Sequence, residues 1–430
     1  MPKNTNSRPT FVDLFAGCGG LSLGLEQAGF KPIFVNEINK DALETYQFNR
    51  KDEFPYLSEE MFFAHDVKEL VLDSNRLEAL KTAFLNFHGV DVKSLENGLD
   101  LLVGGPPCQG YSGIGHRRSY SVDKEQLPSN HLYQDMAFLI SQLKPKLFLF
   151  ENVRGLLNSR WTQDGSKGEI WRDVQKTFHA LDGYSIRSQL VFAKNYGVPQ
   201  NRPRILMVGI RNDLGFKFDD ENDDSIAAGL LPHPDEYSVA PPHLEELLSD
   251  LIDLHYQNGG STQVYPFDPM NEIQSYLRMN REGHVASKGQ PITEHDYSNH
   301  SPHVVRKFQH MIEHDGEIPD EYKTKKFSQK VLKSKWTASG PNITVTSLAD
   351  DYVHWAQPRS LTVRECARIQ TFPDWYEFKG KRTTGGIRRA GNPRESNHER
   401  EVPKYTQIGN AVPVRLAHIL GQHFRSILKK

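Results

Sequence analysis

The sequence predicts an α/β protein, with a mainly parallel sheet that has helices on both faces and a second, smaller irregular domain. Over the first two hundred residues, short apolar runs alternate with helical patterns, as in parallel sheets covered by helices. A glycine-rich turn follows the first apolar run directly. After Arg211 the alternation stops, and residues 213–345 are rich in Asp, Pro, Asn, Gly and His. We therefore expect two regions of different architecture.

The expected elements of the first region follow one another in a regular order. Short apolar runs predict strands, and apolar residues at the helical spacing predict helices. The expected strands are Thr10–Phe15, Pro32–Asn36, Leu101–Val103, Leu147–Phe150, Arg187–Phe192 and Ile205–Ile210. The expected helices run from the glycine turn to about Ala28, where Gly29 ends the first, and over Lys40–Asn49, Leu70–Phe87 and His131–Leu143. The helical pattern returns at Thr362–Gln370 and Val414–Leu428.

The composition is that of a globular protein. The 430 residues are 37% apolar and 25% charged, which is enough to build a core. No apolar run approaches the ~18 residues of a membrane span, and the first eight residues lack the apolar core of a secretory signal. The three cysteines, Cys18, Cys108 and Cys366, cannot form a disulfide framework, and none has a zinc-ligand neighbour. We expect a soluble intracellular protein without a metal.

Charge is unevenly distributed along the chain, although the net charge is only −2. Residues 213–260 contain twelve acids and one base, Lys217. Lys323–Lys335 contains six lysines in thirteen residues, and residues 375–405 contain eight Lys or Arg against four acids. A basic patch can bind a polyanion whatever the net charge. A solvated face is the ordinary explanation of a lysine run taken alone.

The glycine-rich turn indicates a cofactor site. Gly17, Gly19 and Gly20 permit tight backbone geometry and close approach of a ligand to the N-terminus of a helix. Glu37 ends the second strand, twenty residues after Gly17, where a carboxylate can accept hydrogen bonds from ribose hydroxyls. The pattern predicts an adenosine-containing cofactor, and its departure from G-x-G-x-x-G argues against NAD or FAD. The alternative is a turn with a surface glutamate.

Three further motifs lie at the carboxyl ends of expected strands, where open α/β sheets bind their ligands. Cys108 follows the turn Gly104–Pro107, whose prolines fix the backbone. We interpret this cysteine as a nucleophile and not as a small buried hydrophobe. Glu151 follows a buried strand and is a candidate general acid or base, with a capping or solvated glutamate as the alternative. Arg202 and Arg204 alternate at the start of a strand and suit recognition of an anion or carbonyl, unless they form surface salt bridges.

Together these motifs resemble the conserved blocks of the C5-cytosine DNA methyltransferases, in the order of that family from residue 11 to residue 413. The nucleophile block and the last block are highly specific. The six matching blocks are Phe11–Gly20 for the cofactor, Gly105–Ser112 for the nucleophile, Glu151–Val153 for the acid, Gln200–Arg204 for the arginines, Arg359–Pro373 for bracing the recognition domain, and Gln407–Pro413, after which the chain returns to the first domain.

The resemblance implies the Rossmann-like sheet of methyltransferases that use S-adenosyl-L-methionine, and implies that compound as cofactor. Glu37 would hold the ribose, Asp66 the adenine amino group, and Pro107 and Asn410 would close the pocket near the methionine part. The implied cofactor residues are Phe15, Gly17, Gly19, Gly20, Glu37, Ile38, Asp66, Val67, Pro107 and Asn410.

The resemblance also implies the reaction, which is methylation of C5 of a flipped-out cytosine in a specific sequence of double-stranded DNA. Attack of the Cys108 thiolate on C6 would break the aromaticity of the ring and make C5 enamine-like. Methyl transfer to C5, loss of the C5 proton and expulsion of the thiolate would complete the cycle. Glu151 would bind N3 and the exocyclic amine, and Arg204, supported by Arg202, would bind O2.

The same resemblance divides the chain into a catalytic and cofactor-binding domain over residues 1–212, a target-recognition domain over 213–404 with the bracing block at 359–374, and a C-terminal segment over 405–430. Gln109–Asn130 suits a loop that closes over DNA, with phosphate contacts from His116, Arg117 and Arg118. The lysines of Lys323–Lys335 would face the DNA backbone. The segments 69–99 and 375–405 are longer than in compact members of the family.

A chain of this kind resembles a bacterial modification enzyme of a restriction-modification system. We expect a cytoplasmic monomer that joins the nucleoid through DNA, with a cognate restriction endonuclease acting on the same site. A transfer-RNA cytosine-5 methyltransferase is one alternative, but its Cys-Phe-Thr signature is missing because residues 213–345 contain no cysteine. A catalytically silent DNA-binding homologue would have lost Cys108, Glu151 or Arg204, and a nucleotide-cofactor oxidoreductase leaves Pro106–Cys108 unexplained.

Overall fold

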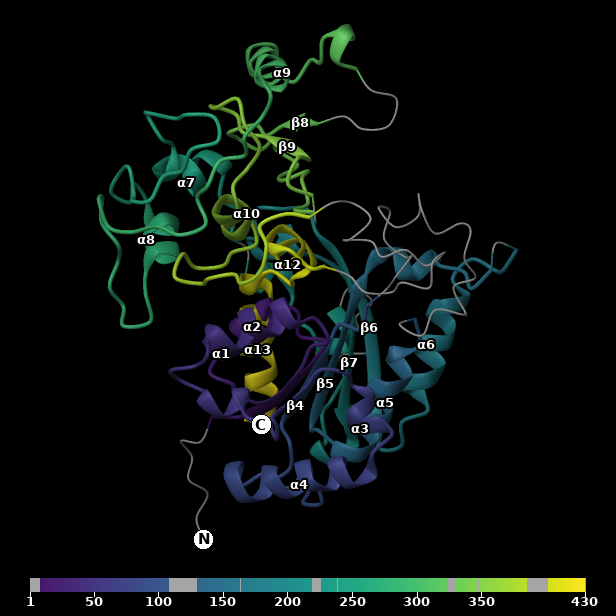
Figure 1. Cartoon of the computed structure of the whole chain (residues 1–430). Helices are drawn as coiled ribbons and strands as arrows, with labels where there is room; N and C mark the ends of the chain where they lie inside the picture. The colour runs from purple at the N-terminus through teal and green to yellow at the C-terminus, as the bar shows by residue number, and fades with distance from the viewer. Residues whose placement is uncertain are drawn as a thin grey trace.

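The computed structural model of the chain describes residues 8–107, 130–162, 164–218, 226–237, 239–323, 329–346, 348–384 and 401–429. Counted over these residues, a seven-stranded sheet with strand order β3-β2-β1-β4-β5-β7-β6 occupies the lower half of the molecule (Figure 1). The five neighbouring strands β3, β2, β1, β4 and β5 are parallel to one another. Strand β7 is antiparallel to both β5 and β6. The expected mainly parallel sheet is confirmed. The strands are β1 Thr10–Leu14, β2 Lys31–Asn36, β3 Phe63–Ala64, β4 Leu101–Gly104, β5 Leu147–Val153, β6 Tyr184–Phe192 and β7 Pro203–Arg211.

The central strands are buried on both faces, which explains their continuous apolar sequences. Every residue of β1 and β4 is buried. In β5, Leu147–Phe150 are buried, and partial exposure begins at Glu151. Such runs are typical of parallel strands that helices cover on both sides. The first polar side chain that β5 presents is therefore at its carboxyl end.

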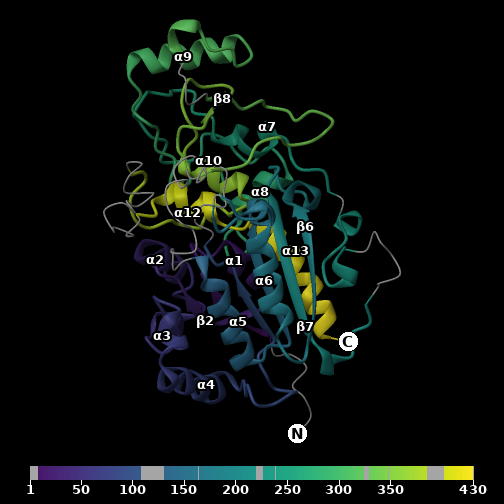
Figure 2. The ribbon, with the colours of Figure 1, turned by 90° about the vertical axis from the view of Figure 1, so that its right-hand side faces the viewer.

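Helices cover both faces of the sheet, and in Figure 2 α5 and α6 lie in front of the strands. On this face α4, α5 and α6 contribute Leu80, Met136 and Val174 to one core. On the opposite face α1 and α13 contribute Leu25 and Leu420 to another. The helices are α1 Gly20–Gln27, α2 Lys40–Phe48, α3 Lys68–Val71, α4 Ser74–His88, α5 Leu132–Leu143, α6 Glu169–His179 and α13 Val414–Leu428.

Helices α1 and α13 pack closely, because glycines remove the side chains between them. A Cβ on Gly24 would lie 2.4 Å from the Cβ of Ala417, and a Cβ on Gly421 would lie 2.7 Å from the Cβ of Ala28. Substitution of either glycine would force the helices apart. The last helix of the chain is in this way fixed against the helix that follows the glycine turn.

The single helix expected over Leu70–Phe87 is wrong, because the chain forms α3, a short break and then α4. The carboxylate of Asp73 accepts hydrogen bonds from the main-chain N–H groups of Asn75 and Arg76, at 2.9 and 3.1 Å. An aspartate in this capping position starts a new helix. Gly89, at φ +67°, then ends α4.

The upper part of the molecule consists of short elements joined by long connections (Figure 1). Its helices and strands are α7 Leu244–Leu248, α8 Glu272–Arg278, α9 Pro302–Glu313, β8 Lys330–Val331, β9 Tyr352–Val353, α10 Val363–Ile369 and α12 Lys404–Asn410. Short 3₁₀ helices are η1 Pro55–Ser58, η4 Arg154–Asn158, η5 Ala193–Tyr196, η6 Asn212–Leu214, η7 Ile226–Gly229, η8 Pro234–Tyr237, η9 Ser249–Leu251 and η10 Asp320–Tyr322. Although Leu230 and Leu231 follow the sheet in sequence, they pack in the same core as α1 and α13.

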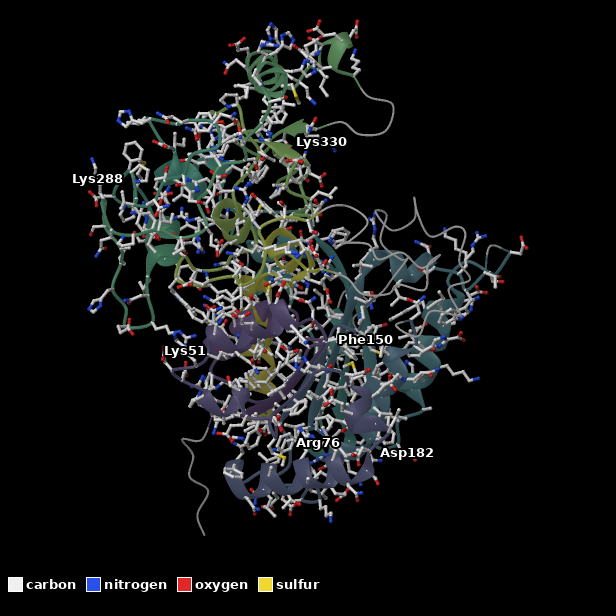
Figure 3. The ribbon with its side chains drawn as sticks, in the orientation of Figure 1. Lys51, Arg76, Phe150, Asp182, Lys288 and Lys330 are labelled. Carbon is white, nitrogen blue, oxygen red and sulfur yellow. The ribbon has the colours of Figure 1, made fainter. Side chains whose placement is uncertain are left out.

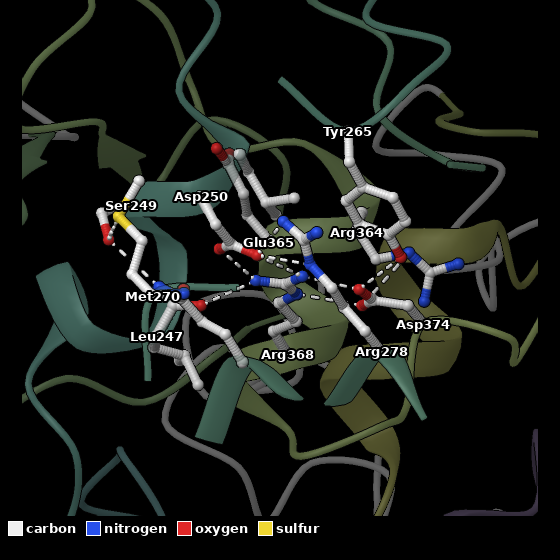
Figure 4. Close-up of polar contacts among 12 residues, drawn as sticks. Leu247, Ser249, Asp250, Tyr265, Met270, Arg278, Arg364, Glu365, Arg368 and Asp374 are labelled. Carbon is white, nitrogen blue, oxygen red and sulfur yellow. Dashed lines mark hydrogen bonds and ion pairs between the residues drawn. The ribbon is translucent and has the colours of Figure 1, made fainter. Parts of the chain in front are cut away.

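A buried cluster of charges stabilises the upper part (Figure 4). At its centre, the Arg368 guanidinium donates to the carboxylates of both Asp250 and Asp374. Arg278 also donates to Asp250, from both Nε and Nη2. The Tyr265 hydroxyl donates to Asp374 at 2.8 Å. We call these five residues the Arg368 cluster. Its members come from α8, η9, α10 and the connections beside them, so the cluster links elements that are distant in sequence.

Candidate active site

The ends of β4 and β5 lie side by side at the carboxyl edge of the sheet. Gly104 is the register partner of Phe150, so the turn after β4 lies next to the residues after Phe150. The side-chain amide of Asn152, which is buried, donates to the main-chain carbonyl of Pro106 at 3.1 Å. This hydrogen bond fixes the turn that precedes the expected nucleophile. Cys108 itself lies outside the described residues, as do His116, Arg117 and Arg118.

Glu151 lies directly against the turn after β4. A Cβ on Gly105 would lie 2.9 Å from Oε2 of Glu151, so only glycine leaves room for the carboxylate. The other carboxylate oxygen, Oε1, lies 2.5 Å from Nε of Arg204 on β7, and both side chains are almost buried. Residues from three strands thus meet at one point. The expected acid and one expected arginine form a pair beside the expected nucleophile turn.

This pair presents complementary groups to a ligand. A carboxylate accepts hydrogen bonds, and a guanidinium has five N–H donors in a fixed plane. Arg204 also donates from Nη1 to the carbonyl of Pro203 at 2.8 Å, which fixes the orientation of its side chain. A planar base with both donors and acceptors on one edge suits such a surface.

Arg202 has different partners from Arg204. Its guanidinium donates to the main-chain carbonyls of Val345 and Gly409, at 3.1 and 2.6 Å. Burial lowers the pKa of Arg202, and the neighbouring Arg204 lowers it further. Arg202 lies just before the first residue of β7 and connects the sheet to the upper part, at Val345, and to α12, at Gly409.

The glycine turn and Glu37 lie together, as the sequence predicted. Oε2 of Glu37 accepts from the main-chain N–H of Gly17, and Oε1 accepts from that of Asn39, both at 2.8 Å. Burial raises the pKa of Glu37, while these two hydrogen bonds oppose the shift. Each oxygen keeps a second lone pair for a ligand hydroxyl. Gly17 has φ +56°, and a Cβ there would meet no atom of the described residues within 4 Å, so among these residues this side of the turn is open.

The neighbouring residues fit an adenosine ligand. The side chain of Ile38, next to Glu37, is 69% exposed, and the adenine ring of such a ligand could pack on it. Asp66 is half-buried, and its Oδ1 accepts from the N–H of Lys68 at 2.9 Å. Val67 differs from these residues because its side chain is buried in a core, which leaves only its main chain for a ligand. Phe15, at φ +58°, packs its ring against the same core.

The remaining predicted cofactor residues lie at several positions around the turn. Pro107 and Asn410 are exposed. Gly19 and Gly20 are buried, and a Cβ on Gly20 would lie 2.5 Å from the carbonyl oxygen of Val412. The first residues of α1 therefore contact the chain just after α12. This contact brings the last block of the resemblance to the glycine turn.

Sequence reasoning missed two asparagines that support the site. Asn36 donates to the carbonyls of Ala64 and His65 and accepts from the N–H of Phe15, so it joins the ends of three strands. Asn152 fixes the Pro106 carbonyl as described above. Both lie at the carboxyl end of a strand whose preceding residues are buried and mostly apolar. An amide at the polar end of an apolar strand was the available signal.

The two described cysteines are poor nucleophile candidates. Cys18 and Cys366 are both buried, and burial raises the pKa of each thiol, for Cys18 to about 12. A thiol in such a position carries almost no thiolate at neutral pH. Among the parts of the chain that the structure describes, no group of three or more His, Cys, Asp or Glu could hold a metal ion. No helix in those parts is long and apolar enough to cross a membrane.

Solved structures share this fold. A DNA modification methyltransferase encoded within an Escherichia coli prophage matches with a TM-score of 0.64 at 23% identity, covering 98% of this chain and 100% of the other. The Schizosaccharomyces pombe Dnmt2 methyltransferase matches with a TM-score of 0.52 at 14% identity, covering 98% and 100%. The chain therefore shares its fold with these two proteins.

Residues 9–426 match the family of C-5 cytosine-specific DNA methylases, and the chain belongs to this family. It is a DNA cytosine-5-methyltransferase. The Type II methyltransferase M.DdeI of Desulfomicrobium norvegicum is 29% identical over 428 residues, covering 96% of this chain and 87% of the relative. M.PspPI of a Psychrobacter species, also named a Type II methyltransferase, is 31% identical over 422 residues, covering 96% and 78%. The family to which the six sequence blocks pointed is confirmed.

Proposed function

We propose that this DNA methyltransferase acts through a covalent bond between Cys108 and C6 of a cytosine, with Glu151 and Arg204 binding the base. The observation that supports this most directly is the Glu151–Arg204 pair at 2.5 Å, placed against Gly105 of the nucleophile turn. The burial of Cys18 and Cys366 also favours Cys108 among the three cysteines.

In the proposed mechanism, the Cys108 thiolate adds to C6, and the electrons of the C5–C6 double bond move toward C5 and the N3–O2 side of the ring. Glu151 binds N3 and the exocyclic amine, and Arg204 donates to O2. Preorganised groups of this kind stabilise charge as it develops in the transition state. After methylation, loss of the C5 proton lets the thiolate leave and restores the double bond. Because C6 is not accessible inside a duplex, the cytosine must first be flipped out of the helix.

We further propose that Glu37, Ile38, Asp66 and the turn around Gly17 hold S-adenosyl-L-methionine, with Phe15, Gly19, Gly20, Val67, Pro107 and Asn410 completing the site. This compound supplies an electrophilic methyl group. The open side of Gly17 and the free lone pairs of the Glu37 carboxylate support the proposal. Arg202 is assigned a positioning role, since its guanidinium holds two main-chain carbonyls.

We assign residues 213–404 to target recognition, and we infer that the lysines of Lys323–Lys335 face DNA phosphates. Lys330, on β8, lies in the upper part of the molecule, above the strand that carries Phe150 (Figure 3). Lys323, Lys333 and Lys335 form ion pairs with Asp320, Asp315 and Glu245. These lysines are all exposed, and such pairs contribute little free energy. They can therefore exchange a carboxylate for a phosphate at low cost.

The relatives named Type II methyltransferases support a role in a restriction-modification system. We infer that a cognate restriction endonuclease acts on the same DNA sequence, and that the methyltransferase works as a monomer.

Bisulfite sequencing of plasmid DNA from cells that express the wild type, Cys108→Ser or Glu151→Gln tests the proposal. We expect protected cytosines at one recurring short sequence with the wild type and none with Cys108→Ser. Glu151→Gln should leave only a small fraction protected. Full protection with Cys108→Ser would overturn the assignment of the nucleophile. Unmethylated DNA from cells with soluble wild-type protein would overturn the proposed substrate, and methylation of transfer RNA would then be measured.

A further inference from the structure

Two buried side chains outside the six sequence blocks hold the carbonyl side of the glycine turn. Nη2 of Arg50 donates to the main-chain carbonyl of Gly19 at 3.2 Å. The hydroxyl of Tyr376 donates to the main-chain carbonyl of Cys18. Nη1 of Arg50 also donates to the Tyr376 hydroxyl at 3.1 Å, so the two side chains form a single unit. We call this unit the Arg50–Tyr376 clamp.

Arg50 is fixed from every side. Its Nε donates to Oε1 of Glu26 at 2.6 Å, and Nη1 donates to the carbonyl of Tyr46 at 3.0 Å. The guanidinium also stacks 3.7 Å from the centre of the Tyr46 ring. Arg50 is only 1% exposed, and removing a charge from water is costly unless it is fully paired. A fully paired guanidinium at this position gives the turn a rigid support.

The clamp leaves no free space behind the turn. A Cβ on Gly19, at φ +86°, would lie 2.8 Å from Nη1 of Arg50 and 2.8 Å from the Tyr46 ring. At Gly17, in contrast, a Cβ would meet no atom within 4 Å in the described parts of the chain, and the Gly17 N–H donates to Glu37. The turn is therefore anchored through its carbonyls on one side and open on the other, where the cofactor is proposed to bind.

The two halves of the clamp come from different parts of the chain and are held together by further bonds. Arg50 follows α2, whereas Tyr376 follows the bracing block. Next to them, the Asn49 side chain donates to the carbonyl of Glu377 at 2.7 Å and accepts from the N–H of Glu377 at 3.0 Å. The N–H of Lys379 donates to the Thr45 hydroxyl at 2.8 Å. The end of α2 and residues 376–379 thus form a fixed pair of segments beneath the turn.

We propose that Arg50 and Tyr376 are positioning residues for cofactor binding, which set the conformation of the Gly17–Gly20 turn through the carbonyls of Cys18 and Gly19. The proposal rests on the proposed S-adenosyl-L-methionine site. Neither side chain contacts the cofactor in this scheme. The clamp instead lowers the entropic cost of binding, because the turn is ordered before the cofactor arrives. Loss of the clamp then weakens cofactor binding more than it slows the chemical step.

The matched variants are Tyr376→Phe and Tyr196→Phe. Each removes one buried tyrosine hydroxyl that donates to a main-chain carbonyl, because Tyr196 donates to Pro232 at 3.0 Å in the core beside α13. Isothermal titration of the full chain with S-adenosyl-L-methionine, without DNA, gives the dissociation constant directly. We expect Tyr376→Phe to raise it about 5- to 30-fold, as for a buried hydrogen bond next to a charge, and Tyr196→Phe to leave it unchanged. In steady-state assays, KM for the cofactor should rise with Tyr376→Phe while kcat and DNA affinity stay close to the wild type.

Glu37→Ala separates failure of the clamp from failure of the site. If Glu37→Ala loses cofactor binding while Tyr376→Phe and Tyr196→Phe both bind like the wild type, the clamp proposal is overturned and the site stands. If Tyr376→Phe and Tyr196→Phe weaken binding equally, the effect is general destabilisation and the clamp proposal also fails. If Glu37→Ala binds normally, the proposed cofactor site itself is wrong. Arg50→Lys keeps a positive charge near Glu26 but loses the planar guanidinium that donates to Gly19 and Tyr376. It should weaken cofactor binding at least as much as Tyr376→Phe.

Discussion

Removal of the Arg368 side chain should destabilise the upper part of the molecule strongly, because it leaves buried carboxylates without their cation. Arg368 makes two hydrogen bonds to Asp374, at 2.9 and 2.6 Å, and two to Asp250, at 2.6 and 3.1 Å. It also donates to the carbonyl of Leu247 at 2.9 Å. In Arg368→Met, the chain keeps comparable volume but loses all five hydrogen bonds.

The size of the effect follows from what remains around the two carboxylates. Asp250 keeps its two hydrogen bonds from Arg278. Among the described residues, Asp374 keeps only the Tyr265 hydroxyl at 2.8 Å and Arg364 at 3.9 Å. Breaking a buried ion pair by removing one partner costs about 3–5 kcal/mol. With an unfolding entropy of about 2.1 cal/mol/K per residue, this lowers Tm by about 3–6 °C if all of the chain unfolds as one unit. If only the ~170 residues from 239 to 410 unfold together, the shift is about 8–14 °C.

Differential scanning calorimetry of wild type, Arg368→Met and Arg278→Met measures this shift. Arg278→Met is the matched control, because it removes a buried arginine while Asp250 keeps Arg368 as a partner. We expect its Tm to fall by a smaller amount. The double variant Arg368→Met, Asp374→Asn should recover part of the loss, since the remaining carboxylate, Asp250, still pairs with Arg278. A Tm for Arg368→Met within 1 °C of the wild type would refute the view that these charges depend on one another.

Three further predictions concern the site and its surroundings. Glu151→Gln removes the charge that pairs with Arg204 and should lower the single-turnover rate of methyl transfer at least ~100-fold, with cofactor affinity unchanged by titration. Burial raises the pKa of Asp13 to about 7, with smaller opposing contributions from Ser22 and Arg50. The folded state holds this proton up to about pH 7, whereas the unfolded state releases it above pH ~4. Between these pH values the free energy of unfolding of the wild type should therefore fall by up to ~1.4 kcal/mol per pH unit relative to Asp13→Asn, with no further fall above pH ~7. Urea unfolding at a series of pH values measures this difference. Glutamine at the lysines of Lys323–Lys335 should reduce the dependence of log K for DNA on log salt by about one unit per lost phosphate contact, and an unaltered slope would make this run a solvated surface.

The sequence predicted the elements in which local pattern and burial agree. The helix at Val414–Leu428 has the predicted bounds, and β1, β4 and β5 follow from their continuous apolar residues. Strand β3 has only two residues, too few for a periodic pattern. The break between α3 and α4 depends on the Asp73 cap, which overrides an apolar spacing that continues through it.

The chemical groups of the site were also predictable, because each follows a strand whose end could be located. Glu37 and Glu151 lie at such ends, and the sheet topology brings them to one edge. The supports of the site were not predictable. Arg202 holds carbonyls 143 and 207 residues away in sequence, and Tyr376 holds one 358 residues away. Spacing along the chain carries no information about partners at such separations.

In each of these supports, a side-chain N–H or O–H group donates a hydrogen bond to a main-chain carbonyl of another segment. Arg202 holds Val345 and Gly409, and Gln370 holds Ile408 and Ala411 from its side-chain amide. A carbonyl is present whatever residue occupies the position, so such a bond fixes the path of the backbone and places no demand on the partner's side chain. The donor, in contrast, must be retained, since its loss leaves a buried carbonyl unpaired. Gln370, Tyr376 and Gly409 therefore shape both the glycine turn and the start of β7, although the groups that we assign to the chemistry itself lie before residue 205.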